Sequence, residues 1–315
     1  MAEKPFKVGL LGLGVMGRRH MDAYRSLPGV EVLTRTSARF AHLQDPDALY
    51  EAMIEDPELD ALDICLPTAL HAPLTIAALD AGRHVLCEKP MALTVEACGR
   101  MLEAGKRNKV VWMVAHVLRF WPAYRVLHDA VTRGTYGAIR SARFARRSGL
   151  PSWAPWLLRP EESGGAPLDL LVHDYDQALW LFGTPESATA RTLGSDNVIA
   201  CELHYPGGLE VAIDGGWYTD NIPFAMEFDL QASEGELRFA NDHLQLIRPS
   251  ATPTEIALSK EDPYATQLAY FLDCCRNGHA PVECPPESSA QAVELALSIS
   301  ALAQGTLKPH ERRYD

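Results

Sequence analysis

A glycine-rich turn directly after the first apolar run of the chain constrains the fold more than any other feature. Residues 6–12, "FKVGLLG", have the character of a buried strand, and residues 18–27 have a helical pattern. Gly12, Gly14 and Gly17 have GxGxxG spacing, which becomes specific when a strand precedes it and a helix follows. The three glycines allow, in turn, a tight turn, close approach of a pyrophosphate, and close helix–strand packing. We therefore predict a dinucleotide-binding βαβ unit.

Strand-like and helical patterns continue to alternate up to about residue 120. The segments that resemble strands are "VEVLT", "LDALDICLP", "RHVLCE" and "VVWMVAH", and helical patterns separate them. Such alternation is typical of an α/β fold in which helices cover both faces of a parallel sheet. We assign residues 1–120 to a Rossmann domain, since a chain of 315 residues is long enough for two domains.

The second part of the chain has a different rhythm. Residues 121–315 contain one early helix, several short alternating segments and two closing helical patterns, each ended by a glycine. Pro206-Gly207-Gly208 between two such segments is a strong hairpin signal. We predict an α+β domain with a large, open, mainly antiparallel sheet.

The charge and composition exclude several classes of partner. The net charge of -12 disfavours nucleic acid and anionic membranes, and no apolar run reaches the length of a membrane span. The N-terminus lacks the pattern of a signal peptide, so we expect a cytoplasmic protein that binds a small molecule. The seven cysteines lack disulfide or metal-site spacing, and we expect mostly buried thiols and no metal.

The segment "TRTSARF" lies where a dinucleotide site recognises the adenosine ribose. An NAD-preferring site places an acid about 20 residues after the glycines, whereas this count reaches Ser37. Arg35, Thr36 and Arg39 add two cations and a hydroxyl, which suit a 2'-phosphate. We expect NADP to be preferred, with NAD still able to bind. The alternative is that both arginines are solvated loop residues.

A helix is expected over "ESGGAPLDLLVHDYDQALWLFGTP", from Pro167 in its first turn to the stop at Gly183. Helical periodicity places Asp169, His173 and Asp176 in a strip beside the apolar stripe and turns Asp174 and Gln177 to solvent. A histidine held by carboxylates suits acid/base chemistry. An ordinary helical Asp/His pair explains the spacing equally well.

Several motifs together resemble one family. "RRH" after the glycines, "LPTALH", "CEKP", "LRFWP" and "GGAPLDLLVHDYD" are similar to the glucose-fructose oxidoreductase, inositol dehydrogenase and MocA family, in the same order from Lys7 to about Gly305. The resemblance implies a nicotinamide-dependent oxidoreductase that transfers hydride between NAD(P) and a sugar, inositol or related polyol. It also implies a homodimer or homotetramer that uses the open sheet, whose exposed face we expect to be apolar.

The resemblance assigns the chemistry to Lys89, Asp169 and His173. Lys89 would hydrogen-bond the reacting oxygen, His173 would take the hydroxyl proton, and Asp169 would orient His173 or the substrate. Pro90 would follow a cis peptide bond. Two departures from the family pattern are Thr68, where asparagine is expected, and a lost or reduced helix before Asp45.

The remaining site residues follow from the same motifs. We expect the cofactor to contact Gly12, Gly14, Val15, Met16, Gly17, Arg35, Thr36, Ser37, Arg39, Leu66, Pro67, Thr68, His71, Glu88 and Lys89. We expect the substrate to contact Lys89, Arg119, Trp153, Trp156, Arg159, Asp169 and His173. Packing explains the two tryptophans as well as sugar stacking does. His71 and His116 are equally suited to structural positions.

Two other functions are compatible with the same motifs. Some proteins of the family are glycosidases that use NAD for a transient oxidation, and others are ligand-sensing regulators without turnover. The retention of Lys89, Asp169 and His173 favours an enzyme over a regulator. The motifs do not identify the substrate or the physiological direction.

Overall fold

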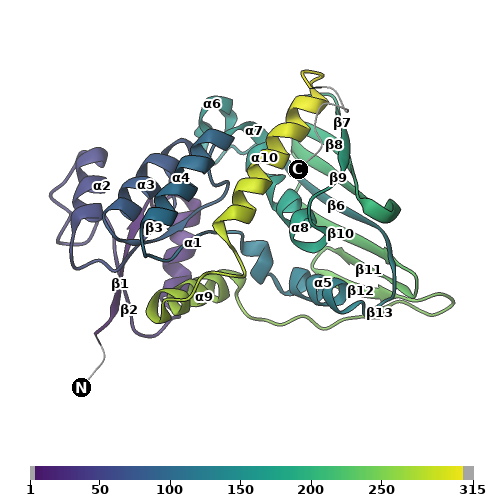
Figure 1. The fold of residues 1–315 in the computed structure, drawn as a ribbon, viewed down its shortest axis with the longest axis horizontal. Coiled ribbons are helices and arrows are strands. Elements are labelled where there is room, and N and C mark those ends of the chain that lie inside the picture. Colours follow the sequence, from purple (N-terminus) through teal and green to yellow (C-terminus); the bar gives the residue numbers. More distant parts are fainter. Residues whose placement is uncertain (1–3, 308–315) are drawn as a thin grey trace. The chain divides into compact units, whose positions relative to one another are not determined.

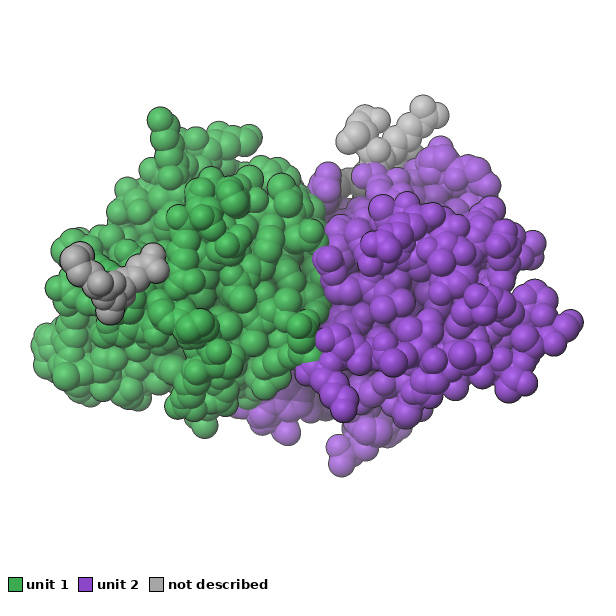
Figure 2. Space-filling model, turned by 90° about the horizontal axis from the view of Figure 1, so that it is seen from below, with its two compact units in different colours: residues 1–120, 261–290 green, residues 121–260, 291–315 purple. Residues whose placement is uncertain are grey.

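The computed structural model describes residues 4–307, which divide into two compact units (Figure 2). Unit 1 contains the described residues up to Phe120 together with Glu261–Ala290, and unit 2 contains Trp121–Lys260 and the described residues from Gln291 onward. Residues 261–290 thus join the N-terminal unit, although the sequence pattern places them with the second domain. The reason is that these residues pack against one face of the N-terminal sheet, as described below.

Unit 1 is built on a parallel sheet with the strand order β2-β1-β3-β4-β5 (Figure 1). Its strands are β1 (Phe6–Leu11), β2 (Val30–Leu33), β3 (Ala61–Ile64), β4 (His84–Cys87) and β5 (Trp112–Val114). Every residue of β3 is buried, as expected for a central strand with both faces covered. The Rossmann topology predicted for the N-terminal part is confirmed.

Helices cover both faces of this sheet. They are α1 (Val15–Tyr24), α2 (Pro46–Glu55), α3 (His71–Asp80), α4 (Val95–Arg107) and α9 (Pro263–Asn277), with short 3-10 helices η1 (Thr68–Leu70) and η2 (Val117–Phe120). α3 packs beside α2 and α4, while α1 packs beside α9. Leu268, Phe271 and Leu272 of α9 are buried in one cluster with Val8 and Met113 of the sheet. Between β2 and α2, the described residues 34–44 form turns, so the loss of a helix there is confirmed.

Unit 2 is dominated by an eight-stranded sheet with the order β13-β12-β11-β10-β6-β9-β8-β7. Its strands are β6 (Ile139–Gly149), β7 (Ser187–Thr192), β8 (Val198–His204), β9 (Glu210–Tyr218), β10 (Ala225–Ala232), β11 (Gly235–Ala240), β12 (His243–Ile247) and β13 (Thr254–Glu255). All neighbours are antiparallel except β6 and β9. Gly207 and Gly208 have φ values of 77° and 83° in the β8–β9 turn, which confirms the expected hairpin.

One face of the large sheet carries the core of unit 2. The helical segments of this unit are α5 (Pro122–Arg133), η3 (Pro155–Leu158), α6 (Pro160–Ser163), α7 (Gly165–Asp169), α8 (Val172–Phe182) and η4 (Pro206–Gly208), and α10 (Pro286–Ala303) closes the described chain. Tyr124 of α5 packs edge-on against Phe228, with ring centroids 5.2 Å apart. Phe144 and Tyr175 are buried in the same unit. The single helix expected from Pro167 to Gly183 is wrong, because the chain turns at Leu170–Leu171.

None of the helices between residues 4 and 307 combines the length and the apolar character that a bilayer crossing requires. All seven cysteines lie in the described part of the chain and are free thiols, and six of them are buried. The expectation of mostly buried thiols is therefore confirmed.

Candidate active site

The glycine turn of unit 1 has the geometry of a phosphate cradle. Gly12 has φ of +95°, and a Cβ atom on it would overlap the carbonyl oxygen of Cys65. A Cβ on Gly17 would overlap the carbonyl oxygen of Gly12, so helix and turn pack without side chains between them. Around Gly14, in contrast, a Cβ would meet no described atom within 4 Å. The turn is closed toward the protein and open toward a ligand, which fits a pyrophosphate at the start of α1.

The first residues of α1 and the segment after β3 extend this cradle. Val15 is exposed and Met16 half-buried, and both begin α1 behind Gly14, which has no side chain to cap the helix. Thr68 is 2% exposed, and its hydroxyl oxygen is buried without a hydrogen-bond partner among residues 4–307. A buried hydroxyl of this kind suits a cofactor hydroxyl or amide. Leu66 and Pro67 lead into it from the carboxyl end of β3.

The segment expected to recognise a 2'-phosphate is a turn with one of its two arginines already paired. Thr34 and Ser37 hydrogen-bond each other, with the Ser37 hydroxyl accepting from the Thr34 N–H at 2.9 Å. Arg39 forms ion pairs with Asp56 and, at 3.0 Å, with Glu58. Its charge is therefore balanced by carboxylates that lie far away in the sequence. Arg35 and Thr36 are exposed.

Lys89 lies directly beyond the carboxyl end of β4, on the same edge of the sheet as the glycine turn and Thr68. Parallel strands place their carboxyl ends at one edge, where α/β proteins bind ligands. Lys89 is half-buried, and its main-chain N–H donates to the Glu88 carboxylate at 3.0 Å. Glu88, which is 5% exposed, also lies 3.2 Å from the imidazole of His20.

His71 links two of these segments. Its Nδ1 lies 2.8 Å from the carbonyl oxygen of Pro90, and its Nε2 lies 2.8 Å from that of Leu66. Burial lowers the pKa of His71, although the two carbonyls act in the opposite direction. The Lys89–Pro90 peptide is cis, as the family resemblance implied. His71 thus fastens the chain after β3 to the chain after β4, a structural position beside the ligand-binding edge.

In unit 2, Asp169 ends α7 and His173 is the second residue of α8. Asp169 is 9% exposed and His173 is half-buried. Asp174 and Gln177 are both fully buried, so the expectation that they face solvent is wrong. Arg146 of β6 explains the position of Asp174, because its Nε donates to Asp174 Oδ2 at 2.8 Å. A buried partner on the sheet outweighs the polarity of the side chain.

The other substrate candidates separate into buried and exposed groups. Arg119 is 1% exposed and donates to the Glu283 carbonyl and the Ser288 hydroxyl, so it joins two segments within unit 1. Trp156 packs beside the small core of Leu157, Ala166 and Trp217.

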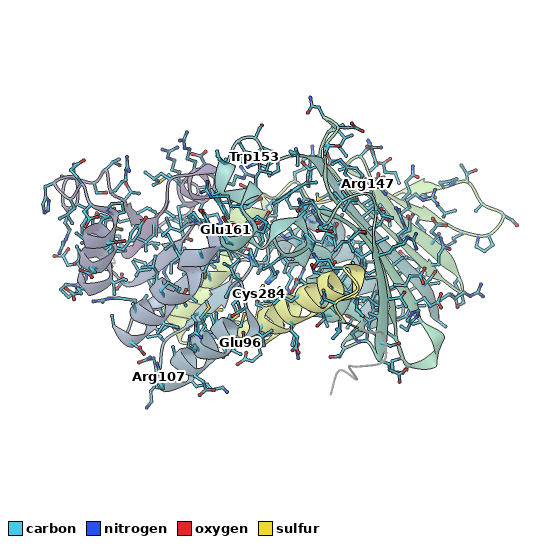
Figure 3. All side chains as sticks on the ribbon, turned by 90° about the horizontal axis from the view of Figure 1, so that it is seen from above. Glu96, Arg107, Arg147, Trp153, Glu161 and Cys284 are labelled. Atoms are coloured by element: carbon cyan, nitrogen blue, oxygen red, sulfur yellow. The ribbon has the colours of Figure 1, made fainter. Side chains whose placement is uncertain are left out.

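Trp153 is 58% exposed, and Figure 3 labels it in the loop between β6 and α6. Arg159 hydrogen-bonds Glu162 one turn further along. Trp153 is therefore the aromatic residue of this segment that presents the most surface to a ligand.

His20 and Asp63 are two residues of this region that the sequence motifs did not single out. They are completely buried and hydrogen-bonded at 2.8 Å. The histidine of "RRH", three residues after Gly17, was a signal for this contact. Its partner could not be inferred, because Asp63 sits in an otherwise apolar strand 43 residues later.

Family models match both parts of the chain. Residues 6–116 match the oxidoreductase family with an NAD-binding Rossmann fold, and residues 124–238 match the GFO/IDH/MocA C-terminal domain. The chain belongs to the Gfo/Idh/MocA family. It is an NAD(P)-binding oxidoreductase of the α/β class.

Named relatives of this Gfo/Idh/MocA chain act on sugars and inositols. A 1,5-anhydro-D-fructose reductase from Ensifer adhaerens is 28% identical over 92% of this chain and 94% of its own length. A myo-inositol 2-dehydrogenase from Thermotoga maritima is 31% identical over 56% of this chain and 55% of its own length. Levoglucosan dehydrogenase in complex with NADH and L-sorbose has a TM-score of 0.83 at 21% identity, covering 96% of this chain and 98% of that chain, which shows the shared fold.

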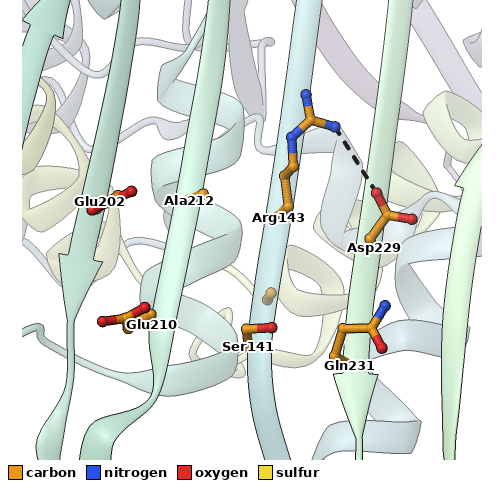
Figure 4. Close-up of a pocket in the computed structure, with 8 residues that line it drawn as sticks. Ser141, Arg143, Glu202, Glu210, Ala212, Asp229 and Gln231 are labelled. Atoms are coloured by element: carbon orange, nitrogen blue, oxygen red, sulfur yellow. Dashed lines mark ion pairs between the residues drawn. The ribbon is translucent and has the colours of Figure 1, made fainter.

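The outer face of the large sheet differs from the expected apolar face. Arg143 and Arg147 of β6 pair with Asp214 of β9, and Arg147 lies 3.6 Å from Glu227 of β10. A pocket of about 190 Å³ on this face is lined by four charged residues, two polar residues and two alanines (Figure 4): Arg143, Glu202, Glu210, Asp229, Ser141, Gln231, Ala142 and Ala212. The described outer face of this Gfo/Idh/MocA protein is therefore largely charged, because alternation along each strand places the apolar side chains on the core side.

Proposed function

We propose that this protein transfers hydride between NAD(P) and a sugar, inositol or related polyol. The observation that carries the proposal is the common edge of the unit 1 sheet, where the glycine turn, Thr68 and Lys89 follow β1, β3 and β4. The names of the relatives support a polyhydroxylated substrate. When bound, the nicotinamide supplies the acceptor or donor of the hydride.

The roles of three side chains complete the proposal. Lys89 hydrogen-bonds the oxygen of the reacting carbon and stabilises its alkoxide character. His173 takes the hydroxyl proton during oxidation and returns it during reduction. Asp169 orients His173 or holds a substrate hydroxyl. Trp153 offers an exposed ring for stacking against a sugar, whereas Trp156 and Arg119 are used in internal packing.

We also propose a preference for NADP(H) over NAD(H), carried mainly by Arg35. The exposed Arg35, with Thr36 and Ser37 beside it, suits a 2'-phosphate. Arg39 contributes less, because Asp56 and Glu58 already neutralise it. Titration of both cofactors, followed by their fluorescence, tests this. We expect Arg35→Ala to weaken NADP(H) binding about tenfold and to leave NAD(H) nearly unchanged, with Arg39→Ala as the comparison. Tighter binding of NAD(H) by the wild type contradicts the preference.

The substrate assignment is tested by a screen of sugars, inositols and sugar lactones with both cofactors, monitored by nicotinamide absorbance. Turnover with net reduction or oxidation of the cofactor supports the proposal. Cleavage of a nitrophenyl glycoside without net cofactor change supports an NAD-dependent glycosidase instead. Saturable binding of a sugar without any turnover supports a ligand-sensing regulator.

We propose that the protein assembles as a homodimer or homotetramer through the outer face of the large sheet. Because this face is charged, we expect the assembly to dissociate as salt is raised, unlike an assembly held by apolar contacts. Light scattering at micromolar concentration in low and high salt measures the mass. A monomer at both salt concentrations contradicts the proposal.

A further inference from the structure

A cluster of buried ionisable side chains lies beneath the glycine turn. His20 comes from α1, Asp63 from β3, and Glu88 from the carboxyl end of β4. Their exposed fractions are 0%, 0% and 5%. Carboxylates buried to this degree are costly unless each has a charged or hydrogen-bonding partner.

Both nitrogens of the His20 ring face a carboxylate. Nδ1 is hydrogen-bonded to Asp63 Oδ2 at 2.8 Å, whereas Nε2 lies at an ion-pair distance of 3.2 Å from Glu88 Oε1 without a hydrogen bond. A neutral ring carries one N–H and turns a lone pair toward the other carboxylate, whereas the imidazolium presents an N–H to both. Burial is the largest single influence and lowers the pKa of His20, but Asp63 and Cys65 together outweigh burial, and the pKa is raised well above its ordinary value.

Several titratable groups surround the ring, and hydrogen bonds are formed among His20, Asp63 and Cys65. The titratable groups that face it are Tyr24 from α1, Asp63 from β3, Cys65 after β3, Glu88 after β4 and Tyr264 from α9. Burial raises the pKa of the Cys65 thiol, with Asp63 acting in the same direction. Cys65 is therefore a protonated thiol that donates to Asp63.

The buried cluster reaches Lys89 through Glu88. Burial raises the pKa of Glu88, but contact with His20 and Lys89 lowers it overall, so the carboxylate is charged. Its second oxygen, Oε2, accepts the main-chain N–H of Lys89 at 3.0 Å. On the other side, the carbonyl oxygen of Cys65 is the atom that a side chain on Gly12 would overlap. One cluster therefore touches both the glycine turn and the residue that carries the proposed catalytic amine.

We propose that His20 is a positioning residue, which holds Glu88 in place and thereby fixes the main chain of Lys89 against the glycine turn. This inference rests on the proposed function insofar as Lys89 acts in turnover. The physical reason is that two charged contacts on one rigid ring set the distance between α1 and the end of β4. Displacement of a reacting group by about 1 Å lowers turnover by up to roughly 10²-fold.

Three variants and a control test the proposal. His20→Gln keeps an uncharged amide donor group, His20→Leu keeps no donor, and Glu88→Gln keeps the volume of Glu88 but removes its charge. His84→Gln is the matched control, because His84 lies at the opposite end of β4 and accepts the Val111 N–H. We expect kcat at saturation to fall roughly 10–100-fold in His20→Leu and about tenfold in His20→Gln and Glu88→Gln. In the two His20 variants the dissociation constant of NADPH changes less than about threefold, and His84→Gln retains wild-type kcat.

A second measurement does not depend on turnover. Lysines are dimethylated with ¹³C-formaldehyde, and the Lys89 signal is assigned by its loss in Lys89→Arg. We expect this signal to shift in folded His20→Gln and Glu88→Gln and to stay in place in His84→Gln. If the wild type oxidises no polyol while the Lys89 signal still shifts, the proposed function fails and the positioning role stands.

Two results overturn the positioning role. One is a wild-type Lys89 signal together with wild-type kcat in folded His20→Gln and Glu88→Gln. The other is a loss confined to the dissociation constant of NADPH, with kcat at saturation and the Lys89 signal unchanged, which would assign His20 to the glycine turn alone.

Discussion

In each unit of the protein a cluster of charged side chains is buried, and these two clusters are built differently. In unit 1, His20 lies between Asp63 and Glu88, and a second oxygen of Glu88 leads to the main chain of Lys89. In unit 2, Arg146 is paired with Asp174 through two hydrogen bonds of 2.8 and 3.0 Å.

The unit 2 cluster is closed on itself. A third hydrogen bond of 3.3 Å from Arg146 reaches the hydroxyl of Tyr124, and all three side chains are at most 2% exposed. The cluster ties β6 to α8 and α5 within the core. The unit 1 cluster ends instead at the carboxyl edge of a parallel sheet, where ligands bind. Buried charge is therefore not in itself a sign of function. What distinguishes the two clusters is that the one in unit 1 ends at a ligand-binding edge, whereas the one in unit 2 ends inside the core.

The largest expected effect is a loss of turnover when the proposed catalytic residues are replaced, which tests whether the edge reached by the unit 1 cluster is functional. We expect Lys89→Ala and His173→Ala each to lower kcat by roughly 10²–10⁴, because each removes a positioned proton-transfer or hydrogen-bonding group. Cofactor affinity changes little. Steady-state kinetics on the best substrate, with cofactor binding measured separately, checks this. Near-wild-type turnover in both variants would remove the catalytic assignment and favour a regulator.

The second effect concerns stability in unit 2. We expect Arg146→Leu to lower the free energy of unfolding by about 3–5 kcal/mol, since it leaves the Asp174 carboxylate buried without its partner. Arg133→Leu is the control within the same unit, because the Arg133 side chain at the end of α5 is 75% exposed and lies 3.5 Å from Asp129. It is expected to cost about 0–1 kcal/mol. Urea unfolding measures the free energy of unfolding of both variants. An equal decrease in the two variants would show that burying the Arg146–Asp174 pair does not increase its contribution to stability.

The third effect is a pH dependence that arises in unit 1. The raised pKa of His20 adds stability that is complete below the unfolded value of about 6.5 and is lost as pH rises through the folded value. The lowered pKa of Glu88 adds stability that is complete above about 4.3 and is lost as pH falls. Between these limits both contributions are present. We expect the stability difference between wild type and His20→Gln to shrink as pH is raised above about 6.5. Urea midpoints that differ by the same amount at every pH up to about 9 argue against the imidazolium.

The smallest effect tests whether the unit 2 cluster is closed. Tyr124→Phe removes one hydroxyl that accepts from Arg146 and keeps the aromatic packing against Phe228. We expect a loss of about 0.5–1.5 kcal/mol in the free energy of unfolding and no change in kcat. Thermal and urea unfolding measure the first, and steady-state kinetics the second. A fall in kcat with unchanged stability would mean that this cluster also serves the active site.

Local sequence patterns determined much of the fold and part of the site. The GxGxxG spacing, the Pro206-Gly207-Gly208 turn and the strand–helix alternation are short-range signals, because dihedral preferences and periodicity act over a few residues. They were sufficient to predict both sheets and to place Lys89 at the end of a parallel strand. The Gfo/Idh/MocA resemblance added roles for Asp169 and His173 that spacing alone left open.

Only the tertiary structure determined which polar side chains are buried and which residues they pair with. Helical periodicity predicted that Asp174 faces solvent, but Arg146, 28 residues earlier, pairs with it inside the core. Arg39, whose side chain is 41% exposed, pairs with the buried Asp56, and His20 lies beside Glu88, although no short-range pattern connects the members of either pair. The chain also returns α9 to cover the first sheet. These contacts join residues far apart in sequence, and their energies depend on burial, which exists only once the elements have packed.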